Sequence, residues 1–251
     1  MLTVERQERI ISLLKDRSII KIQDIVEVTG ASESTIRRDL TELELAKRLK
    51  RIHGGATLLK RKLDEPSMAE KTIKNSHEKQ RIAQKAAEFV EEGDCIFLDA
   101  GTTTFELISY LKGKNIVVVT NGLMNTSELI EAEIETHVLG GYVKPGTRAF
   151  VGPSAVRTLE TFRFDKAFVG ANGISMDDGC TTPDSQEAFI KELAIKFSRE
   201  SFILTDHTKF GETSFSKFAD LHEATVITSQ LVDQEYLRKL SAKTIIEVVQ
   251  A

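Results

Sequence analysis

The chain has 251 residues, 41% of them hydrophobic, which is enough for one large domain or two ordinary domains with a substantial core. No apolar run approaches the roughly 20 residues that span a bilayer, and the N-terminus is polar, so we expect neither a membrane segment nor a signal peptide. The two cysteines, Cys95 and Cys180, lack metal-ligand spacing. We therefore expect free thiols in a reducing cytoplasm, with no metal or other cofactor.

The net charge of −4 is distributed unevenly along the chain. Residues 1–62 carry 14 Lys and Arg against 9 Asp and Glu, a net charge of +5, whereas the other 189 residues carry a net charge of −9. A basic segment before an acidic body indicates a small DNA-binding module attached to a domain with another task. We expect domains at residues 1–57 and 77–251, with residues 58–76 as a polar linker.

The N-terminal segment has the pattern of a helix-turn-helix. Residues 4–16 and 22–29 place apolar side chains at helical spacing, and Gly30 provides a turn after the second of these helices. Ser32 then offers an N-cap for a third helix. The apolar face of that helix is formed by Ile36, Leu40 and Leu43.

The opposite face of the third helix carries hydroxyl and guanidinium groups. Such groups suit phosphates and base edges in the major groove of DNA. An ordinary surface helix with solvated arginines is the alternative, but the preceding helix and glycine turn favour DNA binding. The DNA-binding residues expected on this helix are Ser32, Ser34, Thr35, Arg37, Arg38 and Thr41.

A basic hairpin is predicted directly after the third helix. Gly54 and Gly55 lie between two β-prone arms in residues 49–59, which is the pattern of a hairpin. A basic hairpin in this place is a wing whose Lys50, Arg51 and His53 would reach phosphate or the minor groove. For His53 a solvated loop residue is the alternative, and for the other two it is solubility alone.

From residue 94 onward, apolar strands alternate with amphipathic helices. This alternation indicates a mostly parallel sheet covered on both faces, so the second domain is assigned to the α/β class. Strands are expected at 95–98, 116–120, 136–139, 166–169, 202–205, 224–228 and 244–249. Helices are expected at 77–92, 105–111, 123–130, 154–161, 185–198 and 232–240.

Polar loops after these strands are the candidate ligand sites, because α/β folds bind ligands at the carboxyl ends of their strands. Residues 99–104 join a strand to a helix, where free backbone N–H groups suit a phosphate. A glycine turn with threonine caps is the alternative there. The candidate ligand-binding residues are Asp99, Gly101, Thr102, Thr103, Thr104, Thr120, Asn121, Gly141, Glu187, Asp206 and Lys209.

Two charged pairs among these residues have ordinary alternatives. Asp206 and Lys209 could form a surface ion pair of little energetic value. Glu187 and Lys191 lie at i and i+4, which is the spacing of a routine helix salt bridge.

The motifs of both domains resemble the DeoR family of bacterial transcriptional regulators. The runs 34–40, Ser-Thr-Ile-Arg-Arg-Asp-Leu, and 51–56, Arg-Ile-His-Gly-Gly-Ala, look like its DNA-binding signature. The runs 99–103, 120–121, 139–141, 169–173 and 206–209 look like its effector domain, which is similar to the ribose-5-phosphate isomerase fold. The resemblance implies that the candidate ligand-binding residues bind the effector and adds Asn172 to them. One departure is visible: the family usually has a glycine where the recognition helix ends, and this chain reads Ala46-Lys47-Arg48.

The resemblance implies a repressor of a sugar-utilisation operon that a phosphorylated sugar releases from double-stranded operator DNA. The run 170–174 and the segment 181–188 look most like the fructose-operon repressors, so fructose 1-phosphate is a candidate effector. A tagatose- or lactose-pathway repressor remains open. Because one helix-turn-helix reads only a short half-site, we expect a homodimer or homotetramer.

Two other classes of protein are weighed against this reading, namely a sugar-phosphate isomerase with a DNA module and a non-regulatory nucleic-acid-binding protein. The isomerases carry an Asp-Gly-Ala-Asp loop, whereas the corresponding stretch here looks like residues 169–173, Val-Gly-Ala-Asn-Gly, in which Asn172 cannot hold a proton as Asp can and Gly170 carries no side-chain group. Isomerisation needs a carboxylate base, so we expect a sensor rather than an enzyme.

Overall fold

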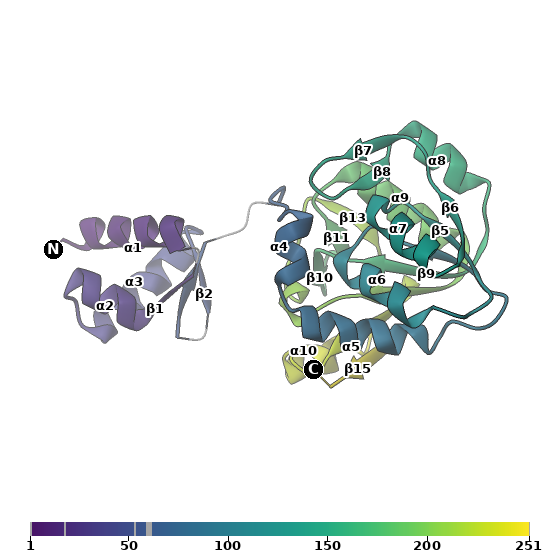
Figure 1. Ribbon diagram of the computed structural model, residues 1–251. Coiled ribbons are helices and arrows are strands. Elements are labelled where there is room, and N and C mark those ends of the chain that lie inside the picture. The colour runs from purple at the N-terminus through teal and green to yellow at the C-terminus, as the bar shows by residue number, and fades with distance from the viewer. Residues whose placement is uncertain (1, 18, 53, 59–61, 251) are drawn as a thin grey trace. The chain divides into compact units, whose positions relative to one another are not determined.

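The computed structural model describes residues 2–17, 19–52, 54–58 and 62–250 (Figure 1). The chain separates into two compact units, Met1–Arg61 and Lys62–Ala251. Among the described residues, no helix is long and apolar enough to cross a membrane.

The first unit is a winged helix-turn-helix, as its sequence predicts. Three helices pack around one core, and a small antiparallel sheet of strand order β1-β3-β2 forms the wing. Ile10, Leu14, Ile36 and Leu40 are buried in that core. The elements are α1 (Thr3–Arg17), β1 (Ile19–Lys21), α2 (Ile22–Thr29), α3 (Glu33–Leu45), β2 (Lys50–Ile52) and β3 (Gly55–Thr57).

At the end of α3, Lys47 occupies the position where a glycine is usual in the family. Lys47 adopts the left-handed conformation with φ of 52°. Its N–H donates to the Glu44 carbonyl at 2.9 Å, and the Arg48 N–H donates to the Leu43 carbonyl at 2.9 Å. This is the Schellman pattern that usually ends on glycine, so α3 stops at a defined residue at the cost of a strained lysine.

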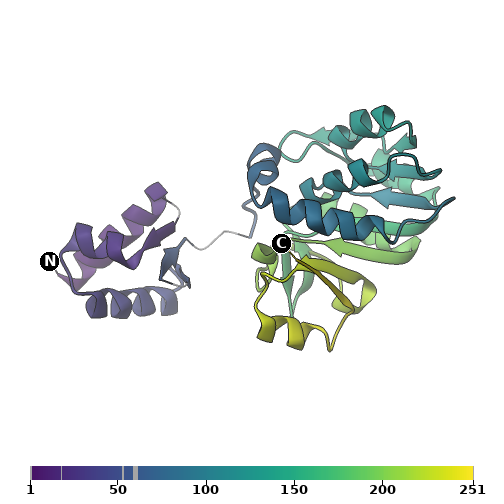
Figure 2. The same cartoon turned by 60° about the horizontal axis from the view of Figure 1, so that its bottom comes forward.

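The second unit, drawn in blue to yellow in Figure 2, contains a central sheet with helices around it. This sheet has seven parallel strands in the order β15-β14-β12-β9-β4-β5-β6. Its strands are β4 (Cys95–Leu98), β5 (Val117–Thr120), β6 (Glu135–Val138), β9 (Phe164–Gly170), β12 (Ser198–Leu204), β14 (Thr225–Ser229) and β15 (Ile246–Val249). Its helices are α4 (Met68–Ile73), α5 (Ser76–Ala87), α6 (Thr102–Leu107), α7 (Leu123–Glu131), α8 (Pro153–Glu160), α9 (Ser185–Lys196) and α10 (Gln234–Leu240), with short 3-10 turns at Ile108–Tyr110, His207–Lys209 and Leu221–Glu223.

Helices cover both faces of this sheet, as the alternation of elements predicts. One core packs α5 and α6 against Ile96, Leu98 and Phe202. The other packs α8 and α9 against Phe97 and Ile203. Successive side chains of one strand enter opposite cores, which is why the strands read as continuous apolar runs.

Two small antiparallel sheets are not predicted by the sequence. They are formed by β7 (Tyr142–Lys144) with β8 (Ala149–Val151), and by β10 (Gly173–Ser175), β11 (Gly179–Thr182) and β13 (Ser216–Ala219). Each strand has only three or four residues. A strand this short carries too few apolar residues to show an alternating pattern.

The segment expected as a linker contains a helix in the structure. In α4 the Ser67 N–H donates to a Glu70 carboxylate oxygen at 2.7 Å, and the Glu70 N–H donates to the Ser67 hydroxyl at 3.3 Å. This capping box starts the helix. Because no residue of α4 is buried, its sequence has no apolar stripe to predict it.

The order of the strands locates the ligand-binding edge. The chain runs from β4 outward to β5 and β6, and then returns past β4 to begin β9 on its other side. The carboxyl ends of β4 and β9 therefore flank a topological switch point, which is where open α/β sheets bind ligands.

Candidate functional site

The recognition helix α3 presents the side chains that its sequence predicts. Ile36, Leu40 and Leu43 are buried, while the side chains of Arg37 and Arg38 are 55% and 69% exposed. Arg37 pairs with Glu33 and Arg38 pairs with Glu42, each one helical turn away. Solvent-exposed pairs of this kind contribute little free energy. The arginines are therefore available to a polyanion.

Two of the expected hydroxyls also have a structural task. The Ser32 hydroxyl caps α3 by accepting the Thr35 N–H at 3.3 Å, and it lies 2.8 Å from the Thr35 hydroxyl. The Ser34 hydroxyl lies 3.0 Å from the Ser32 hydroxyl. These three residues shape the N-terminus of the helix, where backbone N–H groups favour an anion.

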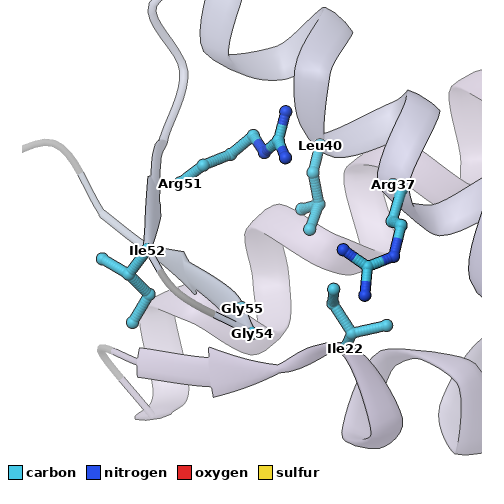
Figure 3. A pocket seen from close by; sticks show the side chains of 7 residues that line it. All are labelled: Ile22, Arg37, Leu40, Arg51, Ile52, Gly54 and Gly55. Atoms are coloured by element: carbon cyan, nitrogen blue, oxygen red, sulfur yellow. The ribbon is translucent and has the colours of Figure 1, made fainter.

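A groove of about 210 Å³ separates the wing from α3 (Figure 3). Figure 3 shows Arg51 reaching across it from β2 and Arg37 pointing into it from the helix. The Arg51 guanidinium donates to the Thr41 hydroxyl at 2.7 Å, and the Arg51 N–H donates to the Glu44 carboxylate at 2.8 Å. Two guanidinium groups beside one groove suit a backbone phosphate.

The other wing residues are placed as follows. Lys50 lies exposed on β2, on the strand that carries Arg51. His53 lies outside the residues that the structure describes. Gly55 pairs with β1 so closely that a Cβ atom would come within 2.1 Å of the Ile20 carbonyl oxygen, which explains a glycine at this position.

Asp39 is a buried charged residue of the recognition helix that the sequence analysis did not assign. Its carboxylate is fully buried and forms an ion pair with the Arg6 guanidinium of α1, including a bond of 3.0 Å. Asp39 lies between Ile36 and Leu40 on the apolar face, and that position could have revealed a buried partner. The pair ties the recognition helix to α1.

In the second unit, the loop after β4 has the form of an anion site. Its shape is held from within, because the Ala100 N–H donates to Asn121 at 2.9 Å and the Gly101 N–H donates to the Thr104 hydroxyl at 3.0 Å. In the described part of the chain, no side chain bonds the hydroxyls of Thr102 or Thr103. Their N–H groups belong to the first turn of α6, which has no intrahelical acceptor for them.

Thr104, Thr120 and Asn121 support this loop from inside the protein. All three are essentially buried. The Thr104 hydroxyl donates to the Asp99 carbonyl at 2.7 Å, and the Thr120 hydroxyl donates to the Leu98 carbonyl at 2.6 Å. Their contacts position the loop, whereas the hydroxyls of Thr102 and Thr103 take no part in these supporting bonds.

Asp99 lies at the switch point and is already paired. Its carboxylate accepts the Gly170 N–H at 3.0 Å and forms an ion pair with Lys191 of α9. Both side chains are at least 95% buried. Gly170 ends β9, so this carboxylate joins the ends of the two strands that flank the switch point.

The salt bridge expected between Glu187 and Lys191 is wrong. Glu187 accepts the Lys144 ammonium at 2.9 Å and the Thr147 hydroxyl at 2.6 Å, whereas Lys191 pairs with Asp99. The i and i+4 rule considers only neighbours on one helix. Here the sheet and the turn after β7 bring closer partners to a buried face of α9.

Gly141 and Asn172 contribute through backbone and amide geometry. Gly141 has φ of +123°, and a Cβ atom there would lie 2.7 Å from the Val151 carbonyl oxygen. The Asn172 amide oxygen accepts the Thr182 hydroxyl at 3.1 Å. Both residues are thus committed to shaping the loops above the sheet.

Asp206 and Lys209 form a second charged group after β12. Their carboxylate and ammonium lie 3.2 Å apart, and Asp206 also accepts Asn75 at 3.1 Å. Burial acts to raise the pKa of Asp206, but the Lys209 ammonium and hydrogen bonds from Thr208 outweigh it and lower the pKa to about 2. Asp206 is 2% exposed, so the expected alternative of a surface ion pair does not describe it.

Lys79 is a second residue that the sequence analysis missed. It lies on α5, is nearly fully buried, and donates to the Lys71 carbonyl. Burial lowers the pKa of Lys79 to about 8, although the nearby Asp206 carboxylate opposes this. A lysine poised between charged and neutral beside a second lysine, Lys209, marks a functional-site candidate.

Glu78, Asp206 and His207 are the group of potential metal ligands in the described chain. Glu78 Oε1 accepts the backbone N–H of His207 at 2.8 Å and the Ser229 hydroxyl at 2.6 Å, and Glu78 Oε2 lies 2.8 Å from His207 Nδ1. These oxygens are therefore occupied by hydrogen bonds, and the cations Lys79 and Lys209 lie nearby. Bonded carboxylate oxygens with two ammonium groups beside them do not favour a metal ion.

Two family models together match most of the chain. A DeoR-like helix-turn-helix domain matches residues 6–62, and a DeoR C terminal sensor domain matches residues 74–230. The chain belongs to the DeoR family. Its family membership, its α/β fold class and its role as a regulator rather than an enzyme therefore agree with the expectations from the sequence.

Several proteins are similar to this DeoR-family regulator along their whole length. It is 48% identical to the uncharacterized HTH-type transcriptional regulator FruR of Bacillus subtilis, over 99% of each chain. It is 38% identical to the lactose phosphotransferase system repressor of Streptococcus mutans, over 96% of this chain and 97% of that one. A ribose 5-phosphate isomerase of Methanocaldococcus jannaschii aligns at a TM-score of 0.41 and 17% identity over 54% of this chain and 55% of that one. That likeness carries no argument about function.

Proposed function

We propose that this DeoR-family regulator represses a fructose-utilisation operon and is released from its operator by a phosphorylated sugar, with fructose 1-phosphate as the first candidate. The similarity to FruR supports the fructose assignment. The similarity to the lactose phosphotransferase system repressor keeps a tagatose or lactose pathway as the alternative. The observation that carries a phosphorylated ligand is the loop after β4, with its unbonded hydroxyls and first-turn N–H groups.

In the proposed effector complex, the phosphate lies on the loop formed by Gly101, Thr102 and Thr103. The backbone N–H groups and both threonine hydroxyls donate to its oxygens. Lys209 and Lys79 add positive charge from the end of β12 and from α5, and Asp206 accepts a sugar hydroxyl. The remaining expected residues hold these groups in place: Asp99, Thr104, Thr120, Asn121, Gly141, Asn172 and Glu187.

In the proposed DNA complex, α3 lies in the major groove. Arg38 is the most exposed of its cations and reaches base edges, while Arg37 and Arg51 hold a backbone phosphate at the groove between wing and helix. Ser32, Ser34 and Thr35 place the helix N-terminus against a second phosphate. Thr41 and Lys50 complete the described part of this surface, and a DNA contact of His53 stays a prediction from the sequence.

The proposed assembly is a homodimer or homotetramer. A single helix-turn-helix covers a short half-site, and half-sites about one helical turn apart, or a multiple of it, require two linked copies. Sedimentation at the concentration that saturates operator DNA tests this assembly. A strictly monomeric protein there would contradict it.

A mobility-shift assay on the promoter next to the protein's own gene tests the function. We expect a specific complex that fructose 1-phosphate dissociates and that other hexose phosphates and ribose 5-phosphate leave intact at the same concentration. Release by tagatose 6-phosphate instead would select the alternative pathway. A complex that no sugar phosphate affects would contradict a sugar-phosphate-responsive repressor.

A further inference from the structure

A partly buried cluster of charges anchors the segment along which the chain enters the second unit. The segment runs from Lys62 to Ile73. The cluster, here called the anchoring cluster, consists of Glu65, Lys144, Asp184 and Glu187. Its members come from the segment itself, from the end of β7, and from the start of α9.

Lys144 is the centre of the anchoring cluster. Its ammonium lies 2.6 Å from Glu65, 2.9 Å from Glu187 and 3.2 Å from Asp184. Burial acts to lower the pKa of Lys144, but the carboxylates of Glu65 and Glu187 outweigh it and raise the pKa above the usual value. The ammonium therefore stays charged at neutral pH and holds three carboxylates that would otherwise repel one another.

Glu65 attaches the segment to this centre. Its side chain is 12% exposed, and it also pairs with Lys71 of α4 at 2.9 Å. Two backbone bonds support the same attachment, from the Met68 N–H to the Gly146 carbonyl at 3.2 Å and from the Phe215 N–H to the Lys62 carbonyl at 3.1 Å. The Gly146 contact falls in the turn directly after Lys144.

The anchoring cluster is also connected to the proposed effector loop. Glu187 and Lys191 lie one turn apart on α9, and Lys191 pairs with Asp99, which begins that loop. Two sets of ion pairs, Glu65–Lys144–Glu187 and Lys191–Asp99, are thus joined by one turn of α9. The first of these residues follows the DNA-binding unit in the chain, and the last precedes the anion site.

We propose that Lys144 is a positioning residue that couples occupancy of the effector loop to the anchoring of the segment that leads to the DNA-binding unit. The inference rests on the proposed function and adds the route of its regulation. A phosphate on the loop competes with Asp99 for Lys191. The resulting shift of α9 weakens the hold of Glu187 on Lys144, and the segment anchored by Glu65 loosens.

Coupling of this kind requires two arrangements of the protein, one with the segment anchored and one with it loosened. A ligand shifts the equilibrium between them only by the difference in its affinity for the two. A residue that only stabilises the fold would change the stability of the protein and leave the effector's influence on DNA binding unaltered. A coupling residue would reduce that influence while leaving each ligand able to bind alone. The two roles are therefore separable by measurement.

The test uses the full-length Glu65→Gln variant, with fructose 1-phosphate as the probe. Glu131→Gln is the matched control, because Glu131 is an exposed glutamate at the end of α7. Calorimetry measures binding of the probe, and fluorescence anisotropy measures the operator Kd with and without it. We expect Glu65→Gln to bind the probe within about twofold of wild type, with an effect of the probe on the operator Kd at least about fivefold smaller than in wild type.

A second measurement needs no variant. Hydrogen exchange of the wild-type protein should speed up at Met68–Ile73 on addition of fructose 1-phosphate, while Gln234–Leu240 in α10 stays unchanged. Coupling in Glu65→Gln equal to wild type, or operator release without faster exchange at Met68–Ile73, would overturn the inference. Failure of wild type to bind the probe at all would instead overturn the proposed effector, and this coupling with it, before any variant is compared.

Discussion

The two units of the chain use charged side chains in opposite ways. On the recognition helix, Arg37 and Arg38 project into solvent, with more than half of each side chain exposed. In the second unit, Asp99 and Lys191 are almost completely buried and paired with each other. Exposed charges act on a partner independently and are screened by salt, whereas a buried pair is disrupted only at a large cost. The first arrangement suits reading DNA, and the second suits a switch between discrete states.

Breaking the buried pair should give the largest effect. Lys191→Met leaves the Asp99 carboxylate buried without its cation, so we expect a loss of about 3–5 kcal/mol in the unfolding free energy of the second unit. Urea denaturation measures it. Lys196→Met, at the exposed end of the same helix, is the control and should lie within about 0.5 kcal/mol of wild type. A loss below about 1 kcal/mol for Lys191→Met would show that the pair does not hold the switch point.

Removing an exposed charge should act on DNA binding and leave folding intact. Arg38→Ala should cost about 1–3 kcal/mol of operator affinity and relax discrimination between bases, because a bidentate contact to a base edge is lost. Arg51→Ala should instead weaken binding to all sequences and reduce the salt slope by about one. Anisotropy titrations over a range of salt concentrations distinguish the two. Unchanged affinity for both variants would mean that the assigned face is not the one that contacts DNA.

The pH dependence of effector binding tests the second lysine beside Asp206. Because the folded-state pKa of Lys79 is about 8, its positive charge is present at pH 7 and mostly lost at pH 9. Affinity for a sugar phosphate should fall over this range by up to about tenfold, which is the change in the protonated fraction. Calorimetry at both pH values measures it, with Lys79→Met as the control that should bind weakly and show no such dependence. Equal affinity of wild type at pH 7 and pH 9 would exclude Lys79 from the site.

The smallest expected effect concerns the strained end of the recognition helix. Lys47→Gly should stabilise the protein by about 0.5–1 kcal/mol, since glycine adopts the left-handed conformation at φ of 52° without the clash that a Cβ atom causes. Denaturation of the first unit's helices, followed by circular dichroism, measures the change. Lys50→Gly, in the extended wing strand, should destabilise instead. A destabilised Lys47→Gly variant would mean that the lysine side chain has a favourable contact that offsets the strain.

The DNA-binding surface could be predicted from sequence because its determinants are local. Helical spacing alone places Ile36 and Leu40 inward and Arg37 and Arg38 outward, and the structure agrees. The exception is Asp39, whose partner Arg6 is 33 residues away on another helix. A pattern within one helix cannot identify such a partner, although the position of Asp39 on the apolar face indicates that its carboxylate is buried and paired.

The effector site could be predicted only in outline. The rule that ligands bind at strand ends locates the loops after β4 and β12. It cannot show that Glu187 meets Lys144 and Lys191 meets Asp99, because those partners are brought together by the order of strands in the sheet. Lys79 was missed for the same reason, since its helix begins before the first strand of the sheet and only tertiary packing places it beside Asp206.

One variant tests most directly whether ligand binding at the loop after β4 controls operator binding by the first unit. Thr103→Val removes a hydroxyl that is proposed to donate a hydrogen bond to the phosphate. It removes no hydrogen bond described within the protein. Operator affinity is measured by anisotropy across a titration of fructose 1-phosphate. We expect the variant to bind operator as tightly as wild type and to need about tenfold more ligand for release, because one hydrogen bond to a charged group is lost. Loss of operator binding in the absence of ligand, or release at the wild-type concentration, would contradict it.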